Sequence, residues 1–183
     1  PGIQVLARAA AKLGEVWIAA PAEQCSALSQ KLTLRELISL EEVTDFPVKT
    51  LGAWRIGGTP VDCVKIALEY LLEEKPDVVL SGINNGFNAG QDIAYSGTLG
   101  AAFEAERLGI PAIAFSAAAD KYLADMEPHL LPLLREQPLE HLLSRAEQDA
   151  EFAVSYLALE NGLTFAADKK FECNVSQYSV MNL

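Results

Sequence analysis

Small polar residues and glycines gather in two stretches of this sequence where phosphate or metal chemistry could take place. Residues 81–92 contain three asparagines, three glycines and a single acid, Asp92. The triplet Ser96-Gly97-Thr98 follows shortly afterwards and precedes a run of small residues. Carbonyl and hydroxyl oxygens are ligands that Mg²⁺ or Mn²⁺ accepts, and hydroxyls with free N–H groups at a helix start suit a phosphate.

The triplet at positions 96–98 has two interpretations. Ser96, Gly97 and Thr98 would offer hydroxyl and N–H groups to a phosphate at the positive end of the helix predicted from residue 97. Alternatively, Ser96 is an ordinary N-cap followed by a first-turn hydroxyl, a common way for a helix to begin. The residues alone leave both interpretations open.

The asparagines at 84, 85 and 88 also have two explanations. Asparagine and glycine dominate tight turns because they tolerate positive φ. A long polar loop after a buried strand, however, is more often a binding site than a connector. Asn84 would then supply a carbonyl oxygen to a cation, and Ser26 in an earlier loop a hydroxyl oxygen. Two neutral ligands hold such an ion poorly, so we expect at least one carboxylate from elsewhere.

Other catalytic chemistries have little support. His129 and His141 lie in segments that we expect to be helical and distant from this loop. Cys25 and Cys63 are best interpreted as idle or buried thiols. The glycines of residues 82–90 are evenly spaced and lack the G-x-G-x-x-G pattern of a dinucleotide site.

Composition restricts the classes of partner. The chain has 183 residues, half of them hydrophobic, which suits one domain with a core. Its net charge of −11 is spread without a basic stripe, which excludes a nucleic-acid polymer as partner and favours a bound cation for any anionic substrate. Three widely spaced cysteines indicate a reducing compartment, and no apolar run is long enough to span a membrane, so we expect a cytoplasmic protein.

The elements that must position these residues alternate between strand and helix. Apolar runs at 16–20, 76–81 and 111–116 predict buried parallel strands, and residues 3–13, 60–72 and 97–108 predict helices. Thr59 is the expected N-cap of the second helix, with Pro60 in its first turn and Asp62 at N3. This alternation predicts a single three-layer α/β domain with a mostly parallel sheet.

Several segments give weaker patterns. Residues 32–34, 48–51 and 53–56 indicate extended structure, and residues 122–134 and 139–151 indicate helices. Residues 152–159 fit either a helix or a strand, and the tail from Lys169 has no assignable pattern. The first helix should bury Ile3, Leu6, Ala10 and Leu13 and stop at Gly14. Because it has no preceding strand to pack beside, we expect a strand and its loop before Pro1.

Several segments together resemble one family, the survival protein E (SurE) or stationary-phase survival proteins. The resemblance covers about residues 1 to 117 in family order. Its pieces are PGI at 1–3, AAP at 19–21 with Ser26, LTL at 32–34, GTPVDCV at 58–64, SGINNG at 81–86 with Asn88 and Gly90, and YSGT at 95–98. Each motif is short, but the ordered set is specific.

The resemblance implies a Rossmann-like domain with a β-rich extension that forms homodimers or homotetramers. It implies a Mg²⁺- or Mn²⁺-dependent phosphatase that hydrolyses nucleoside 5′- and 3′-monophosphates, and short polyphosphate as well. It makes Ser26 and Asn84 metal ligands, with an aspartate pair expected before Pro1. Ser96, Gly97 and Thr98 would bind phosphate, with Asn88 shaping the pocket.

The sequence also departs from the family pattern. Ala22 and Glu23 follow the Ala-Pro where the family has a polar and a basic residue, and Ala27 replaces a glycine after the serine. Beyond residue 138 the family's later strand and dimerisation hairpin are not recognisable. The alternative hypothesis is a nucleotide- or phosphate-binding module without catalysis, which applies if the chain lacks an aspartate pair.

Overall fold

The structure, a computed structural model, describes residues 2–86, 88, 90–117, 130–131, 154–159 and 163–166. Its helical elements are α1 (Gly2–Ala10), α2 (Pro60–Ile66), the π-helical turn η1 (Ala67–Leu71), the 3₁₀ helix η2 (Gly90–Tyr95) and α3 (Gly97–Arg107). Its strands are β1 (Trp17–Pro21), β2 (Leu40–Glu42), β3 (Gly52–Ile56), β4 (Val79–Asn85), β5 (Ala112–Ala117), β6 (Val154–Leu159) and β7 (Leu163–Ala166). None of the described helices is long and apolar enough to cross a membrane.

The strands form two sheets. In the first, β1 lies parallel to β3, and β2 adds to β3 in the antiparallel direction. In the second, β4 lies parallel to β5, and β6 and β7 follow as antiparallel neighbours. Within the described residues, β1 and β4 are each the end strand of their sheet. Each parallel pair therefore lies at one end of its sheet, and the candidate site residues Ser26 and Asn84 follow β1 and lie in β4, respectively.

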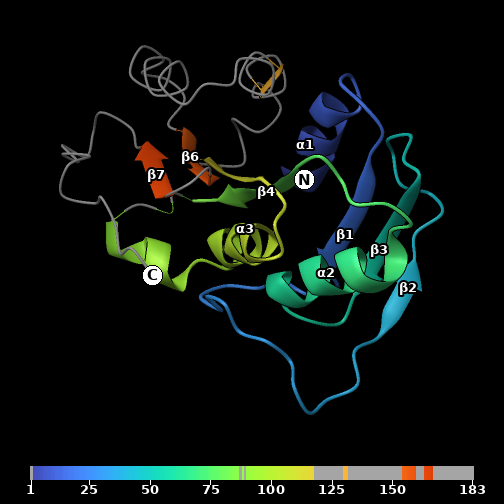
Figure 1. The fold of residues 1–183 in the computed structure, drawn as a ribbon, viewed down its shortest axis with the longest axis horizontal. Helices are drawn as coiled ribbons and strands as arrows, with labels where there is room; N and C mark the ends of the chain where they lie inside the picture. The colour runs from blue at the N-terminus through green and yellow to red at the C-terminus, as the bar shows by residue number, and fades with distance from the viewer. Residues whose placement is uncertain are drawn as a thin grey trace.

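Helices cover both faces of these strands. Figure 1 shows α1 on one side of β1 and β4, with α2 and α3 on the other side. Two separate apolar clusters correspond to these two faces. One joins Ala7 of α1 to Ile18 and Ala53, and the other joins α2 and α3 to β4 and β5. The expected three-layer α/β architecture is confirmed.

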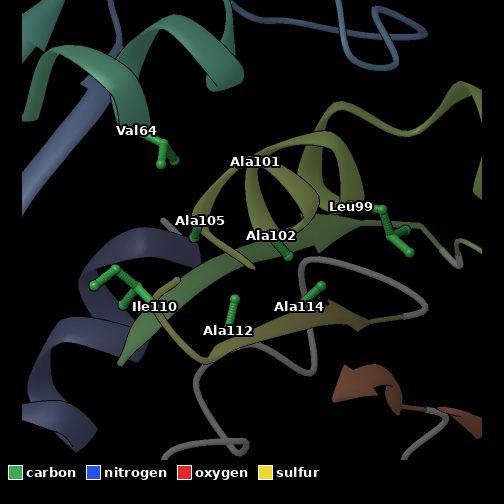
Figure 2. Packing of buried hydrophobic residues seen from close by; sticks show 8 residues of the cluster. All are labelled: Val64, Leu99, Ala101, Ala102, Ala105, Ile110, Ala112 and Ala114. Atoms are coloured by element: carbon green, nitrogen blue, oxygen red, sulfur yellow. The ribbon is translucent and has the colours of Figure 1, made fainter. Parts of the chain in front are cut away.

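The core beneath α3 is built from small side chains. Figure 2 shows Ala102 and Ala105 of α3 above Ala112 and Ala114 of β5, and all four are buried. Alanines allow the helix to approach the strand closely, so the start of α3 is held at a fixed height over the sheet. Every residue of β5 is buried, as expected for a strand that lies between two others, β4 and β6.

The strand expected at 76–81 is displaced toward the C-terminus. It begins at Val79 and continues to Asn85, with an irregular register between Ser81 and Asn84. Glycine and asparagine in that stretch favour a turn locally, but pairing with β5 and burial of Ile83 keep the chain extended. Asn84 therefore stands on the end of a strand, and the prediction that the loop begins at Gly82 was wrong.

The extended segments expected at 32–34 and 48–51 are not strands in the structure. The short strand β2 lies instead at Leu40–Glu42, and only the prediction for 53–56 is confirmed, as β3. Thr33 donates its backbone N–H and its hydroxyl to Asp62, so these groups are used by a side chain and not by a neighbouring strand. Residues 31–39 remain irregular for that reason.

The first helix buries a different face from the expected one. It ends at Ala10, and its buried residues are Gly2, Val5, Leu6, Ala7 and Ala9, whereas Leu13 is 43% exposed. The helix packs against Ile83 of β4 through Gly2 and against Ile18 through Ala7, which widens the buried arc beyond one stripe. Only Leu6 of the expected face is fully buried.

The other expected elements have mixed outcomes. The helices expected from residues 60 and 97 are confirmed, as is the strand at 111–116. The segment at 152–159 resolves as strand β6. Of the helix expected at 122–134, only residues 130–131 are described, and they are helical. The helix expected at 139–151, His129, His141, Cys173 and the tail from Lys169 lie outside the described residues.

Candidate functional site

Two segments that are distant in sequence meet beside the start of α3. One is the β1–β2 loop, residues 22–39, which carries Ser26. The other is the end of η2, just before the 96–98 turn. Ser29 Oγ donates to Ala94 O at 2.7 Å, and Ser29 N donates to Tyr95 O at 3.0 Å. These two bonds place the loop that carries Ser26 against the residues that lead into the predicted phosphate turn.

The β1–β2 loop is also fixed to the start of α2 by one carboxylate. Asp62 accepts from Thr33 N at 3.0 Å, from Thr33 Oγ1 at 2.6 Å and from Thr59 N at 2.8 Å. Thr59 completes a capping box by accepting from Asp62 N, and its hydroxyl donates to Lys31 O. The buried carboxylate of Asp62 is therefore one of the attachments of this eighteen-residue loop, which has no regular structure.

The hydrogen bonds of Asp62 also determine its charge state. Burial alone would raise the pKa of Asp62, but the donors from Thr33 and Thr59 together outweigh it and hold the pKa below its usual value. The carboxylate is therefore ionised at neutral pH. Because its oxygens are used by Thr33 and Thr59, Asp62 has a structural role in the loop and is not a free ligand for a cation.

The two cysteines near this loop are poor nucleophiles. Cys25 is half-buried, and its Sγ lies 3.9 Å from Gly58 O. Burial raises the pKa of Cys25, and Asp62 and Glu23 raise it further. Burial, followed by the neighbouring Cys25 and Asp62, raises the pKa of Cys63 to about 12. Both thiols are protonated at neutral pH, which argues against thiolate chemistry at this site.

Asn84 stands at the carboxyl end of β4, opposite Ser116 of β5. Its side chain is half-buried, and Nδ2 donates to Gly86 O at 2.8 Å. This bond orients the amide through its nitrogen and does not use the carbonyl Oδ1. The geometry suits a side chain that offers an oxygen to a cation, although the same bond would also stabilise a simple turn.

Asn88 is held inward from the segment after β4. Its Nδ2 donates to Ser116 Oγ at 2.6 Å, and both side chains are buried. The bond attaches this segment to strand β5. That Asn88 shapes the pocket of the candidate site stays a prediction.

The 96–98 turn has the form of a capped helix start. Ser96 is buried and its Oγ accepts from Leu99 N at 3.3 Å, so this hydroxyl acts as the N-cap of α3. Ser81 Oγ donates to Thr98 O at 2.8 Å, which ties the turn to β4. The first N–H groups of a helix have no acceptor within it, so the amides of Gly97 and Thr98 are suited to an anion. Capping and phosphate binding are compatible here.

The oxygen donors fit a hard cation in type but not in charge. Ser26 Oγ and Asn84 Oδ1 are the ligand types that Mg²⁺ and Mn²⁺ prefer, but both are neutral. No group of three or more His, Cys, Asp or Glu that could hold a metal occurs among the described residues. A cation at this position would need carboxylates from outside that part of the chain.

Sequence patterns did not identify the residues that position the candidate groups. Thr59 and Asp62 were expected only as helix-start residues, although a T-P-x-D pattern can indicate a capping box. The partner of Ser29 lies 65 residues away and that of Thr33 lies 29 residues away. Ser81 and Ser116, which hold Thr98 and Asn88, gave no local pattern. Contacts at such separations have no sequence periodicity to reveal them.

Comparison with known proteins relates the chain to one family. The family described as Survival protein SurE matches residues 1–172. The protein named 5′-nucleotidase SurE from Gemmatimonas aurantiaca is 50% identical over 126 residues, which covers 68% of this chain and 47% of that protein. The protein named 5′-nucleotidase SurE 2 from Chlamydia caviae is 50% identical over 107 residues, 58% of this chain and 38% of that protein.

A solved structure supports the same relationship. The crystal structure of the SurE protein from Aquifex aeolicus aligns with a TM-score of 0.66 and 37% sequence identity, covering 74% of this chain and 54% of that chain. The alignments span about half or less of the length of these relatives.

Proposed function

This chain belongs to the survival protein SurE family, and we propose that the complete protein hydrolyses nucleoside 5′-monophosphates to nucleoside and phosphate with a divalent cation. Two similar proteins carry the name 5′-nucleotidase SurE. The observation that carries the proposal is the pair of bonds from Ser29 to Ala94 and Tyr95. They bring the loop with Ser26 beside the start of α3, where a phosphate would bind.

The cation would be Mg²⁺ or Mn²⁺, held by Ser26 Oγ and Asn84 Oδ1 together with carboxylates from outside the described residues. When bound, it would supply a Lewis acid for the phosphate and lower the pKa of an attacking water. Asn84 is prepared for this role because its amide nitrogen is already engaged by Gly86 O. Its carbonyl oxygen can then face a ligand without rotation of the side chain.

The start of α3 would hold the phosphate. The amides of Gly97 and Thr98 lie at the positive end of an 11-residue helix, where an anion is stabilised by the helix dipole and by unpaired N–H groups. Ser96 fixes this end by capping Leu99 N, and Ser81 fixes it to β4 through Thr98 O. Donors that are already oriented lose little free energy to reorganisation when charge develops on the phosphate oxygens.

The finer features of the function follow from the resemblance. We propose that 3′-monophosphates and short polyphosphate are additional substrates, that the protein acts in the cytoplasm, and that it assembles as a homodimer or homotetramer. The free thiols of Cys25 and Cys63 fit a reducing compartment. Light scattering on the full-length protein checks the assembly, and phosphate release from 3′-AMP and tripolyphosphate checks the substrate range.

A second candidate function is a nucleotide- or phosphate-binding module without catalysis. The amides at the start of α3, which are suited to an anion without any metal, support it. Such a module would bind the phosphate group of a nucleotide at the start of α3 but would not hydrolyse it. Calorimetry with AMP, in parallel with a phosphate assay, distinguishes binding alone from turnover.

Phosphate release from AMP and GMP by the full-length protein tests the proposal. We expect release that requires Mn²⁺ or Mg²⁺ and that stops when the cation is chelated. We expect Asn84→Ala to reduce this activity strongly, by about 100-fold, because one ligand of the cation is lost. Full metal-dependent activity in Asn84→Ala would refute the assignment of Asn84. Binding of AMP without any phosphate release would favour the binding module.

A further inference from the structure

We propose that Ser29 is a positioning residue, which holds the β1–β2 loop so that Ser26 keeps a fixed distance from the phosphate-binding start of α3. The inference rests on the proposed function for its catalytic consequence. The contact itself stands on geometry alone, because Ser29 donates two hydrogen bonds to consecutive carbonyls, Ala94 O and Tyr95 O.

The backbone of Ser29 has a conformation that needs an explanation. Its φ is 50°, and Ala27 in the same loop has a φ of 53°. Residues other than glycine, asparagine and aspartate adopt this left-handed conformation rarely, at a cost of about 1 kcal/mol. If flexibility alone were needed, glycine would serve better at both positions. Serine at 29 therefore provides something that glycine lacks, and its hydroxyl bond to Ala94 O is that contribution.

The opposite side of the contact is shaped to receive the loop. A Cβ added at Gly100 of α3 would overlap Ser29 O, so only glycine allows the loop backbone to lie this close to the helix. Gly100 lies in the first turn of α3, and its N–H donates to Ser96 O. The loop thus rests directly on the first turn of the helix that is proposed to bind phosphate.

Asp62 holds the other end of the same segment. It fixes Thr33, and Thr59 fixes Lys31, so the segment 29–33 is attached at both of its ends and in the middle. Ser26 lies only three residues before Ser29 and is exposed. Loss of the Asp62 contacts would free the loop at Thr33, whereas loss of the Ser29 hydroxyl would weaken the attachment that lies nearest to Ser26.

Ser29→Gly tests the proposal, with Ala27→Gly as the matched control, and both are made in the full-length protein. Each variant places glycine at a position of positive φ in the same loop, but only Ser29→Gly removes a hydroxyl bond. Both variants should fold, because glycine relieves the left-handed strain. The measurements are kcat and KM for AMP with Mn²⁺, the Mn²⁺ concentration for half-maximal activity, and hydrogen exchange of the amides of residues 28–33.

We expect Ser29→Gly to lower kcat about 10-fold and to raise the Mn²⁺ requirement, because a small displacement of a ligand weakens the reactive geometry. KM for AMP should change little, since the start of α3 is intact. The amides of residues 28–33 should exchange hydrogen faster in Ser29→Gly than in the wild type. Ala27→Gly should stay within about twofold of the wild type in all of these quantities.

Two results overturn the proposal. Wild-type kcat in Ser29→Gly, or an equal loss in Ala27→Gly, would show that the hydroxyl does not position Ser26. Unchanged exchange at residues 28–33 in Ser29→Gly would show that Ser29 does not hold the loop, whether or not the protein is a phosphatase. If the wild type releases no phosphate but only Ser29→Gly exchanges faster, the proposed function fails and the contact stands.

Discussion

The β1–β2 loop and the end of β4 with the segment after it, which carry the candidate site residues, are held by different means. The loop depends on side chains that bond across long sequence distances, namely Asp62 with Thr33 and Ser29 with Ala94. The end of β4 depends on strand pairing, because Asn84 stands in register with Ser116, and Asn88 of the following segment donates to that same serine.

This difference determines how each region should respond to mutation. One carboxylate of α2, Asp62, accepts two hydrogen bonds from Thr33 of the β1–β2 loop and one from Thr59, so its removal has several consequences at once. The segment after β4 shares its support with the backbone ladder of β4 and β5, and no single side chain dominates it. We therefore expect larger and less local effects in the loop than beside β5.

Asp62→Ala should have the largest effect on stability. It removes a helix cap and leaves the N–H groups of Thr33 and Thr59 without their acceptor, so we expect a loss of about 3 kcal/mol in the free energy of unfolding. Urea denaturation measures it. Asp77→Ala is the matched control, because Asp77 is exposed, and it should change stability by less than about 0.5 kcal/mol. Equal effects in the two variants would contradict the anchoring role of Asp62.

Gly100→Ala should be destabilising, although alanine normally favours a helix. Its Cβ would overlap the backbone of Ser29, which cannot move aside as a side chain can, so we expect a loss of about 2 kcal/mol. Gly14→Ala provides the control, since a Cβ there meets no atom within 4 Å. Thermal unfolding of both variants checks the prediction. A stabilised Gly100→Ala would mean that the loop does not rest on α3.

Ser116→Ala should have a smaller effect, confined to the segment after β4. It removes the acceptor of Asn88 Nδ2 and leaves a buried amide N–H unpaired, at a cost of about 1 to 2 kcal/mol. Hydrogen exchange should increase at residues 86–95 but not at residues 28–33. Faster exchange in both regions would show that they are not independently supported.

Acid should lower the stability that Asp62 contributes to the attachment of the β1–β2 loop, because the pKa of Asp62 is lowered in the folded protein. Because the folded pKa of Asp62 lies below its unfolded value of about 3.9, the unfolded state binds more protons in that range. The stabilisation is therefore complete above about pH 4 and is lost as the pH falls through the folded pKa. Denaturant unfolding from pH 2 to 6 should show a steeper decline for the wild type than for Asp62→Asn. Parallel curves would contradict the prediction.

Local sequence patterns predicted where α2 and α3 begin and predicted the buried strand β5. Thr59, Pro60 and Asp62 indicated the start of α2 because capping depends on residues within one turn. The buried run of β5 and the small residues after Ser96 were equally clear. At the site, the sequence indicated Asn84 and the 96–98 turn as candidate groups, and their roles as ligands stay predictions.

Contacts between residues distant in sequence determined the features that the local sequence did not predict. Leu32, Thr33 and Leu34 have the composition of a strand, but Asp62 takes the hydrogen-bonding groups of Thr33, and Leu34 is 84% exposed. Glycine and asparagine suggested a turn from Gly82, yet pairing with β5 extends β4 to Asn85. In both cases a partner distant in sequence outweighed the local preference.

The central claim is that Ser26 and Asn84 bind the same cation. A double-mutant cycle in the full-length protein tests it most directly, with Ser26→Ala, Asn84→Ala and the double variant. The quantity compared is the Mn²⁺ concentration that gives half-maximal phosphate release. Titration calorimetry gives the Mn²⁺ concentration for half-saturation as a second measure. If both residues bind one ion, the double variant should lose much less affinity than the sum of the two single losses, because the first substitution already disrupts the shared site. Losses that add independently would contradict a common site.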